Sequence, residues 1–443
     1  MFSGLEISFV DGPVLAPAHP LPEVIEQLLG DGCPVESFED QLLEDGGLEA
    51  LATWYAVRPS LERERRLRYR VLRNNEPMAT FIPAVGLASP IEAMPQIRVR
   101  LSRFAHVRRD GDALILDSPR ALGRVALHSP RMLESIGVLA NPVTAADLAT
   151  HSGEETAWCA AFIGLLCAAA LVTVADDSGT TAEDREPVKG WEFHDLVMHE
   201  RSRPFRSDRP VGATNRFGES TTELSEARAG GAPIVLARPD IAALSENDVP
   251  FTRVLEARRS RRFHGYTAIT LDQLSEFLFR TLRATSRDGD HAQAAGRFRV
   301  YPGGGACHPL EAYVVVARCD GLVPGVYHYL ADAHALAPIE CDASAAQSLI
   351  RQSAVPMERG SEQQLQVVLT ARFAAINRRY EGNAYALIMQ EVGAVYQTMY
   401  LVATAMGLAG CAVGGGNADA FARLIGTNPL EESSVGAFVL GAT

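Results

Sequence analysis

The longest apolar stretch, Ala384 to Ala412, is the feature that most limits what this chain can fold into. Its length would allow it to cross a membrane, but Gln390, Glu391 and Gln397 interrupt it, and a membrane span usually excludes such side chains. We therefore predict a buried helix of a soluble protein. With 443 residues, 47% of them apolar, the chain is long enough for two or three domains with sizeable cores.

Charge and cysteine content narrow the class of protein. The net charge of −13 gives no general attraction to nucleic acid. The seven cysteines are scattered and never form Cys-x-x-Cys, which is typical of a reducing compartment, and the N-terminus lacks the features of a secretory signal. No metal-ligand constellation is visible. We expect a cytoplasmic protein without nucleic-acid or membrane partners.

Four segments follow one another along the chain. Residues Leu67 to Arg73 alternate in polarity, and the turn at Asn74-Asn75 separates them from the apolar run Met78 to Val85, as in a β-hairpin. A second hairpin is predicted around a turn at 109–112, and a polar stretch begins at Asp176. The predicted segments are a winged-helix-like module at 1–90, a second one at 96–175, a linker and wrapping segment at 176–248, and an α+β domain at 249–443.

Several helices are predicted from their caps and apolar faces. Thr144 stands where an N-cap is expected, and Glu155 to Ala169 carries an apolar helical face. In the last domain, Thr270 is the expected N-cap of another helix, and Ala418 to Ile425 forms a further one.

A first candidate site motif is an arginine cluster at 258–262. Its guanidinium groups and one hydroxyl suit a phosphate, because arginine offers fixed bidentate donors and keeps its charge. A solvated, charged helix end would show the same residues.

Two glycine-rich motifs are further candidates. The stretch Tyr301 to Tyr313 contains three consecutive glycines, which let backbone amides approach a flat ligand closely. Gly414 to Gly416 precede a predicted helix, whose N-terminus can bind an anion. Taken singly, each motif could equally be an ordinary turn.

In their order and spacing, the three motifs resemble those of SagB- and McbC-type dehydrogenases, the azoline oxidases of the nitroreductase superfamily. The resemblance covers roughly Trp191 to Thr443. It is carried by Arg-Arg-Ser-x-Arg at 258–262, Pro-x-Gly-Gly-x-x-His-Pro-Leu-Glu at 302–311, and Gly-Val-Tyr-His-Tyr at 325–329. It implies a nitroreductase-like α+β domain, an antiparallel-type sheet with flanking helices. The family usually has serine where this chain has Gly303.

The resemblance implies an FMN site at a homodimer interface. It assigns the phosphate and ribityl chain to Arg258, Arg259, Ser260 and Arg262, the flank of the isoalloxazine to Pro302, Gly303 and Gly304, and closure of the site to Gly414 and Gly415.

The family also has a Lys-Tyr pair linked to catalysis, and here it reads Arg379-Tyr380. Tyr380 is retained, but Arg379 is a poor general base because a guanidinium scarcely deprotonates. Among His264, His308 and His328, His308 is the leading alternative because it lies in the expected flavin loop. Cys307 beside it is expected to be a small hydrophobic side chain beside a turn rather than a reactive thiol.

The function implied is oxidation of thiazoline or oxazoline rings to thiazoles or oxazoles in a ribosomally made precursor peptide. A proton leaves the ring carbon derived from Cα, a hydride passes from the adjacent carbon to FMN, and oxygen reoxidises the flavin. The alternatives are a general NAD(P)H-dependent flavin reductase for nitro compounds or quinones, and a catalytically silent partner of a cyclodehydratase.

The N-terminal modules are expected either to hold a leader peptide or to serve as a structural appendage. Strand addition at an arginine-rich edge would suit an acidic leader. The arginines of that expected edge are Arg66, Arg68, Arg70 and Arg73.

Overall fold

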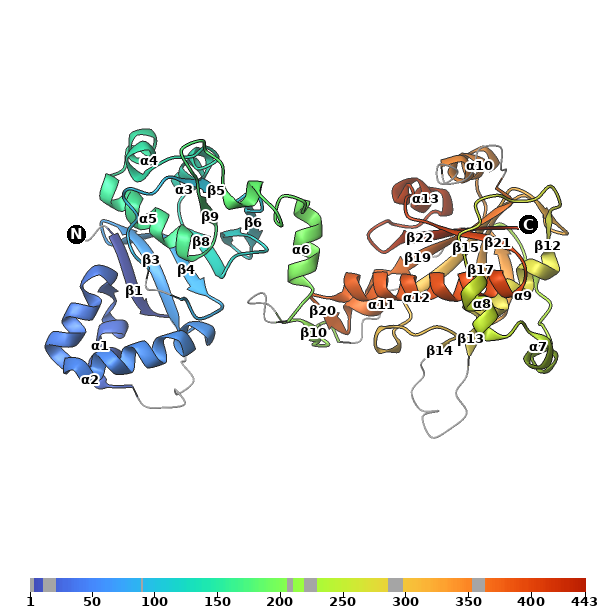
Figure 1. Cartoon of the computed structure of the whole chain (residues 1–443), viewed down its shortest axis with the longest axis horizontal. Coiled ribbons are helices and arrows are strands. Elements are labelled where there is room, and N and C mark those ends of the chain that lie inside the picture. The colour runs from blue at the N-terminus through green and yellow to red at the C-terminus, as the bar shows by residue number, and fades with distance from the viewer. Residues whose placement is uncertain are drawn as a thin grey trace. The chain divides into compact units, whose positions relative to one another are not determined.

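The chain forms two compact units, Met1–Pro210 and Val211–Thr443 (Figure 1). The computed structural model describes residues 4–10, 21–88, 91–204, 210–218, 229–285, 298–352 and 363–443. Parts of the predicted wrapping segment, 205–209 and 219–228, lie outside the described residues.

An antiparallel seven-stranded sheet, with the order β2-β1-β3-β4-β8-β7-β6, organises the first unit. Its strands are β1 (Gly4–Phe9), β2 (Cys33–Pro34), β3 (Leu67–Arg73), β4 (Glu76–Pro83), β6 (His106–Asp110), β7 (Ala113–Asp117) and β8 (Gly123–Leu127), while β5 (Val99–Leu101) pairs with β9 (Val172–Val174). Its helices are α1 (Glu23–Asp31), α2 (Val35–Arg63), α3 (Arg131–Val138), α4 (Ala145–Ser152), α5 (Thr156–Ala168), the 3₁₀ helix η1 (Ala182–Asp184) and α6 (Phe193–Arg201).

The two predicted N-terminal modules are not separate cores. Strand β4 of the first pairs with β8 of the second, with Phe81 opposite Val125. Their buried side chains form one hydrophobic cluster that runs from Leu5 to Val172. Within the sheet, β4 pairs with β3 on one side and with β8, from the second predicted module, on the other. This pairing joins the two predicted modules into one unit.

Local signals in this unit were predicted correctly. The turn residues Asn74 and Asn75 both have positive φ, 52° and 68°, which a two-residue hairpin turn of the I′ type requires. Thr144 accepts a hydrogen bond from the Asp147 amide and closes a capping box at the start of α4.

The arginine-rich strand is not an edge. Strand β3 lies between β1 and β4, so both of its backbone edges are paired. Arg70 forms an ion pair with Glu6, and Arg73 lies 3.0 Å from the carboxylate of Glu154. The prediction of an arginine-rich docking edge for an acidic leader is therefore wrong, because the sheet uses both edges of β3 and carboxylates of the same unit neutralise these two arginines.

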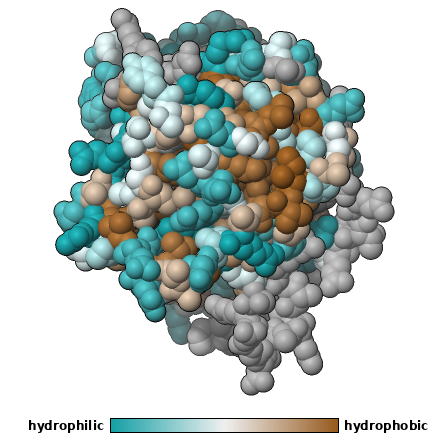
Figure 2. Space-filling model, turned by 90° about the vertical axis from the view of Figure 1, so that its right-hand side faces the viewer, coloured by the Kyte–Doolittle hydropathy of each residue, from teal (hydrophilic) through white to brown (hydrophobic). Residues whose placement is uncertain are grey.

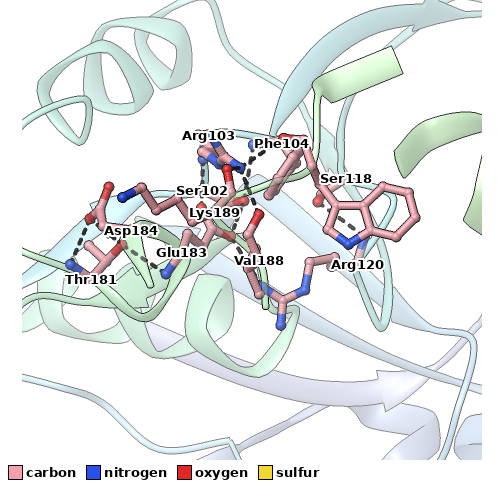
Figure 3. Close-up of polar contacts among 11 residues, drawn as sticks. Ser102, Arg103, Phe104, Ser118, Arg120, Thr181, Glu183, Asp184, Val188 and Lys189 are labelled. Atoms are coloured by element: carbon pink, nitrogen blue, oxygen red, sulfur yellow. Dashed lines mark hydrogen bonds and ion pairs between the residues drawn. The ribbon is translucent and has the colours of Figure 1, made fainter. Parts of the chain in front are cut away.

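Hydrogen bonds hold the first part of the predicted linker against the first unit (Figure 3). The buried carboxylate of Glu183 accepts hydrogen bonds from the Ser102 hydroxyl at 2.7 Å and the Arg103 amide at 2.9 Å, and it lies 3.5 Å from the Arg120 guanidinium. The Arg103 side chain donates to the carbonyl oxygens of three residues, Val188, Lys189 and Trp191. These contacts attach the start of the predicted linker to the first unit and move the boundary towards residue 210.

We predict that Arg103→Ala loosens this segment. Lys189 is the only lysine in the chain, so a lysine-specific protease can cut at one position. Hydrogen bonds to a charged group contribute roughly 1.5–3 kcal/mol, and about 1.4 kcal/mol is tenfold in a local opening equilibrium. Cleavage after Lys189, followed by mass spectrometry, is expected to be about tenfold faster or more in the variant.

Arg185→Ala is the matched control, because Arg185 lies in the same segment but makes an exposed ion pair with Asp176. Such surface pairs contribute little, so its cleavage rate is expected to stay near that of the unchanged chain. An unaltered rate for Arg103→Ala would show that these carbonyl contacts do not hold the segment.

The second unit is built on another antiparallel seven-stranded sheet, with the order β11-β18-β17-β15-β19-β22-β21. These strands are β11 (Ile234–Val235), β15 (Leu310–Val316), β17 (Gly325–Leu330), β18 (Ala335–Pro338), β19 (Leu365–Arg372), β21 (Ala409–Val413) and β22 (Glu432–Gly441). The helices are α7 (Ile241–Asn247), α8 (Phe251–Ala257), α9 (Leu271–Leu282), η2 (Gly304–Ala306), α10 (Ala343–Gln352), α11 (Phe373–Asn377), α12 (Ala384–Ala405) and α13 (Ala418–Ile425). Short pairs join β10 (Gly212–Ala213) to β20 (Tyr380–Glu381), β12 (Ile269–Thr270) to β16 (Cys319–Asp320), and β13 (Ala284–Thr285) to β14 (Phe298–Arg299).

Helices cover both faces of this sheet, as predicted for a nitroreductase-like α+β domain. Side chains of α9 and α12 share one core with alternate strand positions, and side chains of α10 and α13 join the cluster on the other face. Thr270 caps α9 through a capping box with Gln273, as predicted. The apolar run from Ala384 divides into α12 and β21, and Gly407, with φ of 68°, lies at the turn between them.

The surface of the second unit includes exposed apolar side chains. Figure 2 shows hydrophobic residues gathered in a patch among polar ones. Large apolar side chains exposed in this unit include Val235, Phe251, Tyr266, Val323 and Leu430. In the part of the chain that is described, no helix has the length and hydropathy needed to span a bilayer.

Candidate functional site

Helix α12 is the element around which the predicted motifs gather. Its buried stripe includes Ile388, Glu391, Val395 and Met399, a spacing of three or four residues that places one face on the sheet. The arginine motif and the Pro302 loop each contact this helix, and the glycines of the third motif follow β21, which packs on it.

The arginine motif contacts the C-terminal half of α12. The Ser260 hydroxyl lies 2.9 Å from the Tyr400 hydroxyl, and the Arg258 guanidinium lies over the Tyr400 ring, 5.4 Å from its centre. The Arg261 amide donates to the carbonyl oxygen of Gly410 at 3.0 Å. These contacts fix the backbone of the motif beside α12 and β21.

The guanidinium groups of this motif carry uncompensated charge. Within the described ranges, Arg258, Arg259, Arg261 and Arg262 have no carboxylate within ion-pair distance, although the chain is acidic overall. Arg259, Arg261 and Arg262 are exposed and Arg258 is half-buried. A cluster of accessible, unpaired guanidinium groups with a neighbouring hydroxyl fits a phosphate group, so these residues are suited to the phosphate end of FMN.

The glycine loop of the second motif lies against the N-terminal half of α12. A Cβ atom on Gly303 would lie 2.7 Å from a carboxylate oxygen of Glu391 and 2.8 Å from Nδ1 of His308. A Cβ on Gly304 would lie 3.3 Å from Leu387. The absence of a side chain at 303, where the family usually has serine, is what allows this close approach.

Glu391 is the functional candidate that sequence reasoning missed. Only 2% of it is exposed, and among the described residues neither carboxylate oxygen has a hydrogen-bond partner. The nearest cation candidate is His308, whose Nδ1 lies 3.5 Å from one of these oxygens and also lacks a hydrogen-bond partner there. In the sequence, the signal for Glu391 is a single acidic residue within an apolar run, and taken alone it argues only against a membrane span.

A buried carboxylate without hydrogen bonds is costly, so such groups cluster at functional sites. The Tyr301 ring meets His308 edge-on, with centres 5.8 Å apart, and burial raises the pKa of Tyr301. Glu391 and His308 are therefore a candidate pair for proton transfer, in a largely apolar setting beside the glycine loop.

Tyr380 and Arg379 lie against Gly305 of that loop. Gly305 has a positive φ of 57°, and Tyr380 and Arg379 occupy the space that a Cβ on it would need. Arg379 donates to the carbonyl oxygen of Gly305 at 2.8 Å, and its guanidinium also lies 5.7 Å from the centre of the Tyr380 ring. A guanidinium thus lies beside the phenol ring, although the two residues are neighbours in sequence.

The remaining histidine and cysteine candidates have structural surroundings. His264 is buried and accepts from the Gln364 amide, and burial, reinforced by Arg318, lowers its pKa to about 4. His328 stacks on Tyr313. Burial raises the pKa of the Cys307 thiol, which disfavours the reactive thiolate.

Gly414 and Gly415 line a separate pocket of about 350 Å³. Its walls come from α12, β22 and α13, and Tyr396 and Phe421 are among them. Pro302, Gly303 and Gly304 do not line this pocket, so the single chain brings the glycine loops to the same helix but not to one cavity. Over the described ranges, no group of three or more His, Cys, Asp or Glu residues could hold a metal ion.

Comparison with known proteins identifies the second unit. The nitroreductase family model matches residues 255–442. A protein of Methanocaldococcus jannaschii that is named as a nitroreductase is 30% identical over 179 residues, which cover 40% of this chain and 81% of that protein. The chain belongs to the nitroreductase family. Proteins of this family are oxidoreductases that generally bind flavin.

The first unit has a match of its own. The family model of the cyanobactin oxidase ThcOx matches residues 99–208. Over the chain as a whole, the trifolitoxin-processing protein TfxB of Rhizobium leguminosarum bv. trifolii is 30% identical over 155 residues, which cover 34% of this chain and 40% of that protein. These matches confirm the resemblance to the SagB- and McbC-type branch of the nitroreductase superfamily.

This nitroreductase-family chain is also similar to solved structures. One of a Ralstonia eutropha protein named as a nitroreductase is 19% identical, covers 53% of this chain and 99% of its own, and has a TM-score of 0.39. A chain of the E. coli microcin synthetase McbBCD complex is 21% identical, covers 54% of this chain and 83% of its own, and has a TM-score of 0.37.

We predict that Arg258→Ala weakens FMN binding by about tenfold or more, because charge-assisted contacts to a phosphate contribute roughly 1.5–3 kcal/mol each. The dissociation constant is measured by flavin fluorescence titration. Riboflavin, which lacks the phosphate, is expected to bind the variant and the unchanged chain equally.

Arg253→Ala is the matched control, since Arg253 is an exposed arginine of α8 outside the motif. Its FMN affinity is expected to be unchanged. If Arg258→Ala weakened riboflavin as much as FMN, the cluster would not be the phosphate site.

Proposed function

We propose that the protein is an FMN-dependent dehydrogenase that oxidises thiazoline or oxazoline rings to thiazoles or oxazoles in a ribosomally synthesised precursor peptide. The observation that carries this proposal is the presence, in one chain, of a segment matching the cyanobactin oxidase model and a nitroreductase-family domain. The name of TfxB refers to the processing of a toxin, which supports a peptide substrate. The partner that we propose is a cyclodehydratase, which would form the azoline rings.

The residues of the second unit fit FMN. Arg258, Arg259, Ser260 and Arg262 would hold the phosphate and ribityl chain, Pro302, Gly303 and Gly304 would lie beside the ring system, and Gly414 and Gly415 would close the site. When bound, FMN supplies a two-electron acceptor. The helix rises by about 14 Å from Glu391 to Tyr400. The glycine loop beside Glu391 and the arginine motif beside Tyr400 would therefore contact the two ends of one elongated ligand.

The chain itself must handle the proton that leaves the ring carbon. His308 is the acceptor we favour, because the carboxylate of Glu391 lies 3.5 Å from its Nδ1 and stabilises an imidazolium ion. Tyr380, with Arg379 beside its ring, would donate a hydrogen bond to the azoline or its amide. Arg379 holds charge and fixes the loop at Gly305 rather than acting as a base.

A homodimer would complete the site. Phe251 and Leu255 of α8 are exposed, as are Tyr385 and Met389 of α12, and these two helices pack against each other. Exposed apolar side chains on adjoining helices are typical of a protein interface. Because the arginine motif directly follows α8, a partner on this surface would lie next to the bound flavin.

Mass spectrometry tests the function directly. The FMN-loaded protein is incubated in air with a precursor peptide whose azoline rings were formed by a cyclodehydratase. We expect the loss of two hydrogen atoms per ring without added NAD(P)H. Turnover of nitro compounds or quinones with NAD(P)H, with no change in the peptide, would instead assign a flavin reductase.

We predict that Glu391→Gln lowers kcat by roughly 10²-fold while KM and FMN affinity change little, because the variant keeps the shape of the side chain but removes its charge. His308→Gln is expected to cause a similar loss. If Glu391 acts through His308, the double variant falls no further than either single one, and kcat measured on the azoline peptide shows this.

Additive losses would contradict the pairing of these two residues. Glu276→Gln is a control, since that carboxylate belongs to an ion pair on α9. Tyr380→Phe removes only a hydroxyl, and unchanged turnover in that variant with FMN bound would exclude Tyr380 from the mechanism.

A further inference from the structure

The first unit contains a pocket of about 520 Å³ that the flavin site does not involve. It is lined by β1, β3, the two ends of α2, α5 and residues 91–95. Its volume lies in the usual range of about 300–1,000 Å³ for ligand sites. The pocket is therefore large enough to hold a ligand rather than a few waters.

The floor of the pocket is apolar and aromatic. Phe38 and Trp54 are both buried in it, with ring centres 4.8 Å apart, and Leu5, Ile7 and Ile91 surround them. These side chains belong to the single core of the unit, so the floor is preformed. Such a floor suits a large apolar side chain used as an anchor.

The mouth of the pocket is acidic. Glu36, Asp40 and Glu92 are exposed there, and none of them has an ion-pair partner among the described residues. Glu39 adds a fourth carboxylate, which accepts a hydrogen bond from Tyr55 at 2.6 Å. Carboxylates gathered around an apolar opening attract cations and repel anionic ligands.

Arg58, the one cation among the described residues of the lining, does not offset this charge. Arg58 is only 6% exposed, and its guanidinium lies 3.9 Å from the fully buried carboxylate of Glu62. Glu62 also accepts hydrogen bonds from the Tyr69 hydroxyl at 2.7 Å and the Leu87 amide at 2.6 Å. Arg58 is thus neutralised inside the unit, and the mouth remains negative.

We propose that this pocket binds a segment of peptide in which a large apolar side chain is flanked by lysine or arginine. The apolar side chain fills the floor, and the flanking cations reach the carboxylates at the mouth. The inference rests on the proposed function in taking the ligand to be a peptide. The arginine-rich strand predicts an acidic peptide, whereas this pocket favours a basic one. Two guanidinium groups of that strand already form ion pairs within the unit.

Fluorescence anisotropy with the full-length protein tests the proposal. The probe is a labelled peptide with a central Leu-Phe pair and lysines on both sides, and a second peptide has glutamates in place of the lysines. The lysine peptide is expected to bind at least tenfold more tightly, with an affinity that falls as salt increases. Equal binding of both peptides, or preference for the acidic one, overturns the proposal.

Surface variants locate the binding. The pair Glu36→Lys and Asp40→Lys is expected to weaken the lysine peptide at least tenfold, as is Ala157→Trp, which blocks the pocket from the exposed start of α5. The pair Glu44→Lys and Asp45→Lys makes the same charge change on α2 outside the lining and is expected to have no effect. Equal losses in both pairs overturn the assignment.

Other occupants give distinct results. If the pocket variants change the oligomeric mass in gel filtration but not peptide affinity, the pocket holds a second copy of the chain and the proposal fails. Peptide binding that depends on Glu36 and Asp40 without any ring oxidation contradicts the proposed function alone. Ring oxidation that is indifferent to these two residues contradicts this inference alone.

Discussion

Packing of α12 against the sheet of the second unit is the interaction on which the candidate site depends. One face of the helix joins the core, and that face carries Glu391 into an apolar interior next to His308. Tyr400, nine residues further on, holds Ser260 and lies under Arg258. A shift of the helix would therefore displace the arginine motif and the Glu391–His308 pair together, so one helix fixes the relative positions of candidate residues that lie far apart in sequence.

Features set by neighbours in sequence could be predicted, because the residues that cause them are visible together. The turn at Asn74-Asn75 and the caps Thr144 and Thr270 are of this kind, since each depends on a few residues in a row. The glycine and arginine motifs could also be found. Their recognition came from order and spacing, and the structure adds that Arg258 has no ion-pair partner in its described surroundings and that Gly303 has no room for a side chain.

Features set by distant residues could not be predicted. Nothing in the chain near Phe81 indicates that its strand pairs with the strand of Val125. Arg103 ties down a polar segment that begins more than 70 residues later, and composition alone suggests a free linker there. Glu391 was noticed only as an interruption, because its meaning depends on His308 being folded against it.

The pairing of β4 with β8 also bears on how such proteins can diversify. A recombination event between residues 90 and 96 would separate two strands that share backbone hydrogen bonds, and each product would inherit an unpaired edge prone to aggregation. Inheritance of the first unit as a single block avoids that cost. Exchange of the first unit among relatives is therefore expected to use crossover points near residue 210, where the two compact units meet along the chain.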